Sequence, residues 1–288
     1  MVHDKFEALD SGGDFGERLY AWLYANHEAV DDAYLHANSD IVTGLREGFN
    51  QLVDHGAIDG WQIFRFKHKE YNYPCIDWDG SGRTPSGGDI KDFLHDNPSG
   101  DSDACEVSWN EGPNGNGTGD NLHCLRGTHL MVHDQHSCDT DWVNAGNYAL
   151  TDAEGDVCNP DEYNTAFERG RIAWMKGACE DRGQTKNSAI QESLHQLIMR
   201  DHPEVAKHVG EDEDGDPDEH TLGWVNDENE TSPMLTYHAD EFGASGSCLH
   251  YSNGDGNYTT ELTWCTKEAV KAMKEDPDCS DNTMDCEY

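Results

Sequence analysis

The chain has little positive charge: 19 Lys and Arg stand against 58 Asp and Glu in 288 residues, giving a formal net charge of −39. Such a surface repels itself in dilute salt and is tolerated when salt screens the charges. A strongly negative protein is also disfavoured as a partner of naked nucleic acid or of anionic membranes. The acidic, lysine-poor composition is typical of proteins from extreme halophiles and excludes nucleic acid as an expected partner.

Long apolar runs are also absent, which excludes membrane insertion on the sequence alone. Residues 1–7 lack the apolar segment of a signal peptide, so we expect either that a leader was removed or that the protein reaches its location as part of something larger. Low hydrophobicity is one mark of disorder. The 27 aromatic residues (8 Phe, 8 Trp and 11 Tyr) nevertheless favour a packed core.

None of the ten cysteines forms a Cys-x-x-Cys pair, so a cysteine zinc site is not indicated. An even number of scattered cysteines predicts a disulfide framework outside the cytoplasm. Three glycosylation sequons fit an exposed glycoprotein surface, at Asn116, Asn229 and Asn257. We therefore expect an extracellular protein, or one on a cell or virion surface, in a high-salt environment.

Hydrophobic spacing predicts two helices within residues 14–55, the second ending at Gly56. The first rests on Phe15, Leu19, Trp22 and Leu23, and the second on Ile41, Leu45, Phe49 and Leu52. Strands are predicted at residues 61–66, 129–136 and 171–175, with the middle one at the edge of the sheet. Residues 76–121 are rich in loop-forming residues and predict a long surface excursion.

The C-terminal part predicts shorter elements. A poorer helix is expected at residues 204–209, a hairpin between Cys248 and Cys265, which are also placed to form a disulfide, and a last helix capped by Thr266 and ending near Lys274. The acidic run at residues 210–219 suggests calcium, but Pro217 stands where an EF-hand loop needs glycine and rules that loop out. We expect one α+β domain over residues 1–288. Its parts are an N-terminal region (1–124), a core (125–265) and a C-terminal helix with a cysteine-containing tail (266–288).

The stretch Gln191-Glu192-Ser193-Leu194-His195 is the main candidate for chemistry. It lies in a predicted helix over residues 187–200, which Asn187 or Ser188 would cap and which ends before Pro203. Residues four apart share one helix face, so Gln191 and His195 point the same way. The pattern is that of a zinc-protease helix, His-Glu-x-x-His, with glutamine in place of the first histidine.

This segment resembles the metzincin-type zinc metalloproteases, in a divergent form from secreted proteins of halophilic archaea. Two further elements carry the resemblance: His220 in Glu219-His220-Thr221-Leu222-Gly223, and Ser232-Pro233-Met234. The resemblance implies a zincin-like mixed sheet, His195 and His220 as zinc ligands, and Gln191 as a weaker third ligand. It also implies Glu192 as general base, Met234 in the Met-turn beneath the metal, and a substrate cleft along the predicted edge strand at residues 127–136.

The sequence departs from that family in two ways. Glutamine offers zinc a harder and weaker donor than imidazole. His220 follows His195 by 25 positions, whereas the compact family motif has only six, so the acidic run must be an insertion between the two ligands. His133, His136 or His238 would be candidates for a replacement ligand.

Two functions remain open from the sequence. One is a zinc peptidase that hydrolyses a peptide or protein substrate by metal-activated water, with Glu192 as base. The other is an inactive protease fold that serves as a structural or binding protein with assembly partners, because loss of a histidine ligand weakens zinc binding. A third idea, a small-ligand or glycan-binding module with Trp78 and Trp109, has no specific motif behind it.

Overall fold

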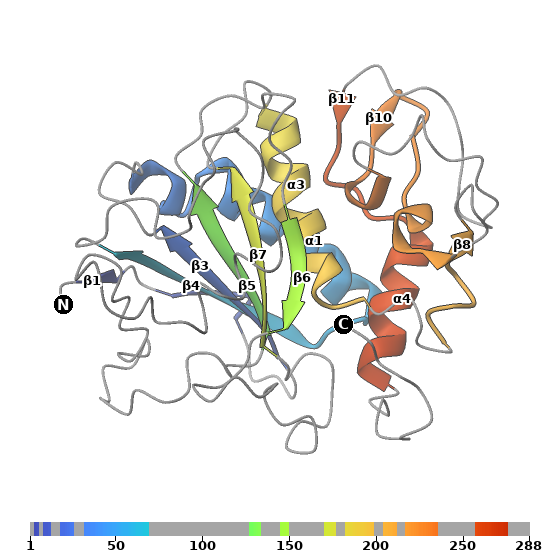
Figure 1. Cartoon of the computed structure of the whole chain (residues 1–288), viewed down its shortest axis with the longest axis horizontal. Coiled ribbons are helices and arrows are strands. Elements are labelled where there is room, and N and C mark those ends of the chain that lie inside the picture. The colour runs from blue at the N-terminus through green and yellow to red at the C-terminus, as the bar shows by residue number, and fades with distance from the viewer. Residues whose placement is uncertain are drawn as a thin grey trace, which may run out of the picture.

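A seven-stranded mixed sheet forms the larger part of the structure. The computed structural model describes residues 3–5, 8–12, 18–25, 32–68, 127–133, 145–149, 170–176, 182–198, 204–211, 217–235 and 257–275. The strands are β1 (His3–Lys5), β2 (Leu9–Asp10), β3 (Arg18–Ala25), β4 (Gly60–His68), β5 (Gly127–His133), β6 (Ala145–Ala149) and β7 (Gly170–Lys176). Their order is β1-β4-β3-β5-β7-β6, and β2 also pairs with β4 (Figure 1). This mixture of helices and strands is compatible with the predicted α+β class.

The centre of the sheet is parallel and its borders are antiparallel. β3 runs parallel to both β4 and β5, and β5 runs parallel to β7. β6 is antiparallel to β7, and β1 and β2 are antiparallel to β4. Parallel neighbours need crossover connections, and helix α1 (Asp40–His55) is the crossover between β3 and β4.

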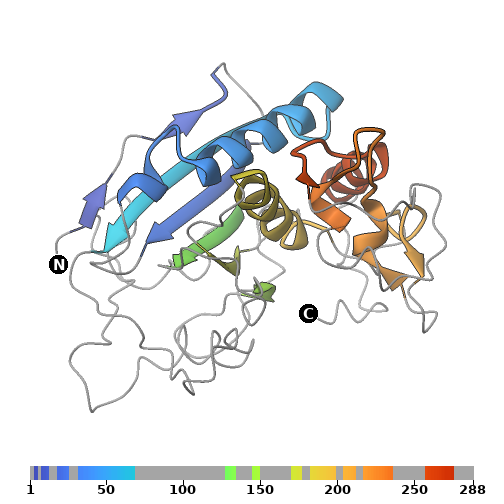
Figure 2. The ribbon, with the colours of Figure 1, turned by 90° about the horizontal axis from the view of Figure 1, so that it is seen from above.

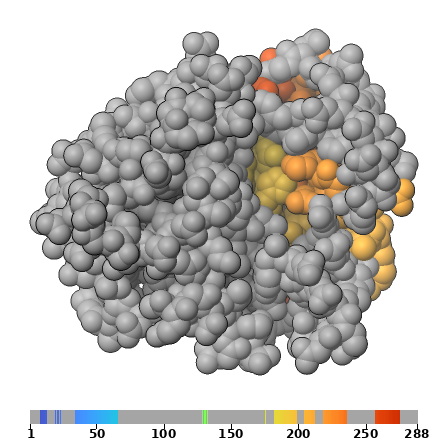
Figure 3. All heavy atoms as spheres, in the orientation of Figure 1, coloured from blue at the N-terminus to red at the C-terminus, as the bar shows by residue number. Residues whose placement is uncertain are grey.

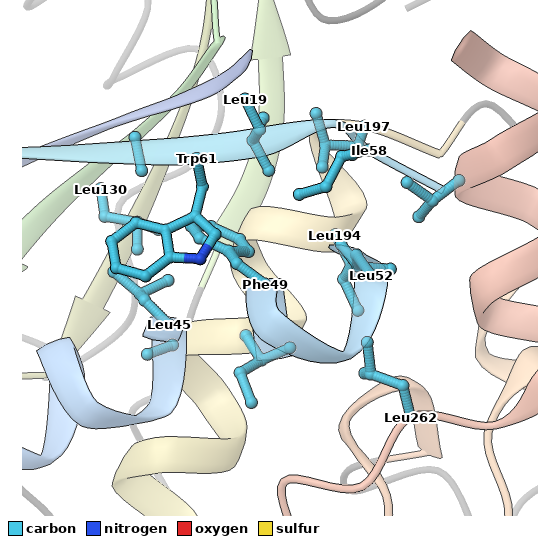
Figure 4. Close-up of a cluster of buried hydrophobic side chains, with 14 of the residues drawn as sticks. Leu19, Leu45, Phe49, Leu52, Ile58, Trp61, Leu130, Leu194, Leu197 and Leu262 are labelled. Atoms are coloured by element: carbon cyan, nitrogen blue, oxygen red, sulfur yellow. The ribbon is translucent and has the colours of Figure 1, made fainter. Parts of the chain in front are cut away.

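Two helices cover one face of the sheet. α1 and α3 (Arg182–His195) pack against each other above the strands (Figure 2). Their apolar faces meet side chains of β3, β4 and β5 in one core, which includes Phe49, Trp61 and Leu194 (Figure 4). Ser39 begins α1 by accepting a hydrogen bond from Val42 N. The left-handed Gly56 (φ 76°) ends the helix, as the sequence predicts.

The remaining elements lie on the other side of α3 from the strands (Figures 1 and 2). They are β8 (Gly210–Glu211), β9 (Pro217–Asp218), β10 (Glu230–Thr231), β11 (Asn257–Tyr258) and α4 (Trp264–Glu275). Three short 3-10 helices complete the fold: η1 (Asp32–Leu35), η5 (Glu219–Leu222) and η6 (Pro233–Leu235). Asn187 ties α3 to this group, because its Nδ2 donates to the carbonyls of Thr231 and Thr259, each at 2.9 Å.

The N-terminal helix prediction was wrong. Residues 18–25 form the central strand β3, and the burial of Leu19, Ala21 and Leu23 repeats every second residue. A central strand that is covered by helices carries apolar residues close together in the sequence. The spacing of such a short apolar run does not tell a strand from a helix. The strands predicted at residues 61–66 and 171–175 are confirmed as β4 and β7.

The predicted edge strand was also placed wrongly. β5 lies inside the sheet between β3 and β7, and the border strand is β6, which the sequence did not reveal. Strand order depends on which strands pair in space, so the position of a strand in the chain does not fix it. Parallel pairing on both sides makes β5 a central strand.

Three predictions near the motif need correction. α3 begins at Arg182 and ends at His195, so Asn187 and Ser188 lie inside the helix and cap nothing. Residues 204–208 form turns in place of a helix. The cap of α4 is Thr263, whose Oγ1 accepts from the backbone N of Thr266 at 2.9 Å, although the helix ends next to Lys274 as expected.

Other predictions fall outside the described residues or are only partly described. The loop at residues 76–121 lies outside them, as does Cys248 with most of its predicted hairpin. The described end of that segment, β11, pairs in parallel with β10. Cys265 is fully buried at the start of α4, and its disulfide with Cys248 stays a prediction. No helix in the described residues is long and apolar enough to cross a membrane.

Candidate functional site

The C-terminal end of α3 carries the motif side chains into the protein. Gln191, Glu192 and His195 are 6%, 4% and 8% exposed, so all three are buried. Polar side chains at this depth need partners or a functional reason, because burial without hydrogen bonds is costly. α3 ends at His195, and Gln196 Nε2 donates to the carbonyl of Glu192 at 2.8 Å.

His220 reaches the same place from a different element. It lies in η5, which begins after Asp218, and the His220 ring stands edge-on to the His195 ring with 4.7 Å between centroids and 67° between planes. Parts of α3 (yellow) and of residues 217–235 (orange) are visible side by side on one face of the molecule in Figure 3. The structure therefore brings together two histidines that are 25 positions apart in the sequence.

Gln191 lies at the Nε2 edge of the His195 ring. Its Nε2 atom lies 3.4 Å from Nε2 of His195, which is the helical i, i+4 pairing expected from the sequence. The two ends of a glutamine amide have nearly the same shape, so a half-turn of the amide brings Oε1 to the same position. Gln191 can thus present either a hydrogen-bond donor or an oxygen ligand beside His195 Nε2.

Two carboxylates face the Nδ1 atoms of the two histidine rings. Asp218 Oδ1 lies 2.7 Å from His220 Nδ1, and Glu219 Oε1 lies 3.3 Å from His195 Nδ1. Asp218 Oδ1 also accepts from the backbone N of His220 at 2.8 Å and so caps η5. The sequence analysis missed both acids as site residues, because in a chain with 58 acidic residues nothing local marks these two.

The two buried glutamates of the site have opposite pKa shifts. Burial raises the pKa of Glu192 from 4.5 to about 8, because the charged carboxylate is cut off from water. Burial also acts to raise the pKa of Glu219, but the hydrogen bond and charge of His195 outweigh it and lower the pKa to about 2. At neutral pH Glu192 is thus protonated and Glu219 is ionised.

The 3-10 helix η6 lies against both elements that carry the site histidines. Met234 is fully buried in η6, which adjoins both α3 and η5. Gly223, which follows η5, approaches η6 so closely that an added Cβ would lie 2.6 Å from the carbonyl carbon of Met234. Trp224 and Ser232 join the two segments, with Trp224 N donating to Ser232 Oγ at 2.8 Å.

The donor set fits a metal only in part. Within the described residues, no three side chains of His, Cys, Asp or Glu form a group that could hold a metal ion. The amide of Gln191 lies at the Nε2 edge of His195, and the His220 ring stands edge-on to the His195 ring. Two histidine nitrogens with one oxygen donor and one open position match the ligand count of catalytic zinc sites. Two histidines and one amide oxygen are thus the donors available to zinc, with Gln191 as the weakest of them.

The three candidate replacement ligands are not among the described side chains. His133 ends β5, and its side chain is not among those described. His136 and His238 lie outside the described residues. Comparison of the chain with models of protein families gives no match, and comparison with curated proteins gives none either.

Proposed function

We propose that this chain is a divergent zincin-like metallopeptidase domain that hydrolyses peptide bonds. The observation that carries the proposal is the meeting of His195 and His220, with ring centroids 4.7 Å apart and with both Nδ1 atoms facing carboxylates. A buried histidine of α3 and a half-buried histidine of η5 come together here, with Gln191 beside the first, and this supports the proposal.

The topology supports the same proposal. The sheet has three parallel strand pairings, and helix α1 connects two of its strands, β3 and β4. An antiparallel border strand, β6, precedes the motif-bearing α3 in the chain. These features suit a zincin-like sheet. β6 is the border strand, and α3 lies against it. An extended peptide that adds to β6 by backbone hydrogen bonds would run beside the site. We therefore assign the substrate-binding role to β6 in place of the strand at residues 127–136.

The residues divide the chemistry between them. His195, His220 and Gln191 would hold zinc, which when bound supplies a Lewis acid that polarises the scissile carbonyl and lowers the pKa of water. Glu192 would accept a proton from the attacking water and return it to the leaving amine. A cation close to Glu192 favours its ionised form and so offsets the burial that raises its pKa to about 8.

A second candidate is an inactive protease fold used as a structural or binding protein. The contact between Gln191 Nε2 and His195 Nε2 favours it, because a donated amide hydrogen would occupy the nitrogen that zinc needs. Both candidates suit the acidic composition of an extracellular, cell-surface or virion protein in high salt. A calcium role for the acidic run has no support from the described residues.

The deciding experiment is metal content together with peptidase activity. The full chain would be purified in high salt without chelator, with His195→Ala and Glu192→Gln as variants. The peptidase proposal expects about one zinc per chain, lost in His195→Ala and kept in Glu192→Gln, which is inactive. A well-folded wild-type protein without metal and without activity would contradict it and leave the inactive fold.

A further inference from the structure

The segment that supplies His220 also supplies both carboxylates that face the site histidines. Asp218 and Glu219 are consecutive, and each reaches an Nδ1 atom: Asp218 that of His220 at 2.7 Å and Glu219 that of His195 at 3.3 Å. All four side chains are largely shielded from solvent. The exposed fraction is 17% for His220 and 19% for Asp218. It is 10% for His195 and 15% for Glu219. One dipeptide therefore contacts the Nδ1 atoms of both site histidines, of which His195 is buried and His220 is half-buried.

We propose that Asp218 and Glu219 are positioning residues that fix both histidines as the Nδ1–H tautomer and so present Nε2 of each ring as the electron-pair donor. This inference deepens the proposed function and rests on it for the identity of the bound group. Asp218 and Glu219 act through His195 and His220 and do not themselves hold the metal.

The argument follows from the chemistry of imidazole. A neutral imidazole carries one N–H and one lone pair, and the hydrogen bond made by one nitrogen decides the state of the other. An ionised carboxylate only accepts hydrogen bonds, so His220 Nδ1 is the donor in its hydrogen bond with Asp218. At His195 the negative charge of Glu219, 3.3 Å from Nδ1, favours a proton on that same atom. The lone pair then lies on Nε2, and in His195 this atom is the one that Gln191 approaches.

The placement of the carboxylates also explains why they are not ligands themselves. Glu219 contacts His195 on the Nδ1 edge, whereas Gln191 contacts the same ring on the Nε2 edge. Asp218 is held in addition by the backbone N of His220. Histidine ligands whose second nitrogen is bonded to a carboxylate are better oriented and more basic, and loss of such a partner typically costs about 10–100-fold in metal affinity.

A second observation concerns the other carboxylate oxygen of Glu219. Its Oε2 atom is buried and has no hydrogen-bond partner among the residues that the structure describes. A buried carboxylate oxygen without a partner costs stability, since its desolvation is not repaid. Truncation of Glu219 therefore removes that cost with the interaction to His195, so a Glu219→Ala protein is expected to fold.

The first arm of the test needs no metal. Nitrogen-15 NMR of the histidine rings distinguishes protonated from unprotonated ring nitrogens, and is applied to the metal-free full chain at a pH where histidine is neutral. The variants are Glu219→Ala and Asp218→Ser, because serine keeps the cap of η5 but is too short to reach the ring. The exposed Glu261→Ala is the matched control.

In wild-type protein and in the control, His195 and His220 should both be Nδ1–H tautomers. Glu219→Ala should raise the Nε2–H population of His195 only, and Asp218→Ser that of His220 only. Nε2–H rings in the wild type, or rings that do not respond to either substitution, would overturn the inference. If Glu219 served only for packing, its substitution would not change the tautomer of His195 selectively.

The second arm titrates Co²⁺ as a spectroscopic stand-in for zinc. Each variant should bind about 10–100-fold more weakly than the control. Binding by the wild type that both substitutions leave unchanged would overturn the positioning role. If the wild type binds no Co²⁺ while the tautomers are as expected, the carboxylates do fix the rings and the metallopeptidase proposal fails, so the two failures are distinguishable.

Discussion

Glu192→Gln is expected to change how stability depends on pH. In the metal-free protein the pKa of Glu192 is raised by burial from 4.5 to about 8. Between these values the folded chain keeps a proton that the unfolded chain has released, so rising pH favours unfolding. Glutamine has nearly the same shape and is neutral at every pH, so the variant is free of this loss.

The magnitude follows from the width of the window. One pKa unit corresponds to about 1.4 kcal/mol, so a shift from 4.5 to about 8 amounts to roughly 4–5 kcal/mol of unfolding free energy. The stability of Glu192→Gln relative to wild type should rise by about 1.4 kcal/mol per pH unit between 4.5 and 8 and then level off. Relaxation of the buried site around the charge would reduce the total.

The assay is urea unfolding at fixed high salt with chelator, at several pH values from 4.5 to 9. The other acids titrate in wild type and variant alike, so the difference between their unfolding free energies isolates position 192. Glu261→Gln, on an exposed residue, is the control and should stay parallel to the wild type. A Glu192→Gln curve that also stays parallel would refute the buried, protonated Glu192.

The other predictions concern the site and its support. Gln191→His should raise zinc affinity by more than tenfold, because imidazole is a better zinc donor than an amide; calorimetric zinc titration measures it, and an unchanged affinity would place the metal elsewhere. Gly223→Ala should cost about 1–3 kcal/mol in urea unfolding, since the added Cβ overlaps the backbone of η6. Asn187→Ala should cost a similar amount, about 1–3 kcal/mol, because a buried and a part-buried carbonyl lose a donor. Lowering the pH from 4.5 toward 2 should remove the stability contributed by ionised Glu219, whose pKa is lowered to about 2, and Glu219→Gln should flatten that loss.

Local patterns predicted several elements correctly. α1, β4 and β7 follow from apolar spacing, and the end of α1 follows from Gly56, whose left-handed conformation is available to glycine at little cost. The i, i+4 spacing of Gln191 and His195 placed both on one face of α3. These features depend on residues close in sequence, so the sequence alone determined them.

The pairing of distant segments was decided by the tertiary structure. Leu19 and Leu23 have a spacing that suits a helix, yet parallel pairing on both sides makes their segment a central strand. β5 is central because it pairs with β3 on one side and with β7 on the other. β6 lies at the border because, among the described strands, it pairs only with β7. Each of these outcomes depends on contacts between residues far apart in the chain, which local spacing does not encode.

The candidate site divides in the same way. The sequence by itself determined the residue types, Gln191, Glu192, His195 and His220, and with them the chemistry that the site can support. Only the tertiary structure decided that Asp218 and Glu219, two acids among 58, would face the histidine rings. It also decided the opposite pKa shifts of Glu192 and Glu219, because burial and charge partners belong to the folded surroundings of a group and not to its place in the sequence.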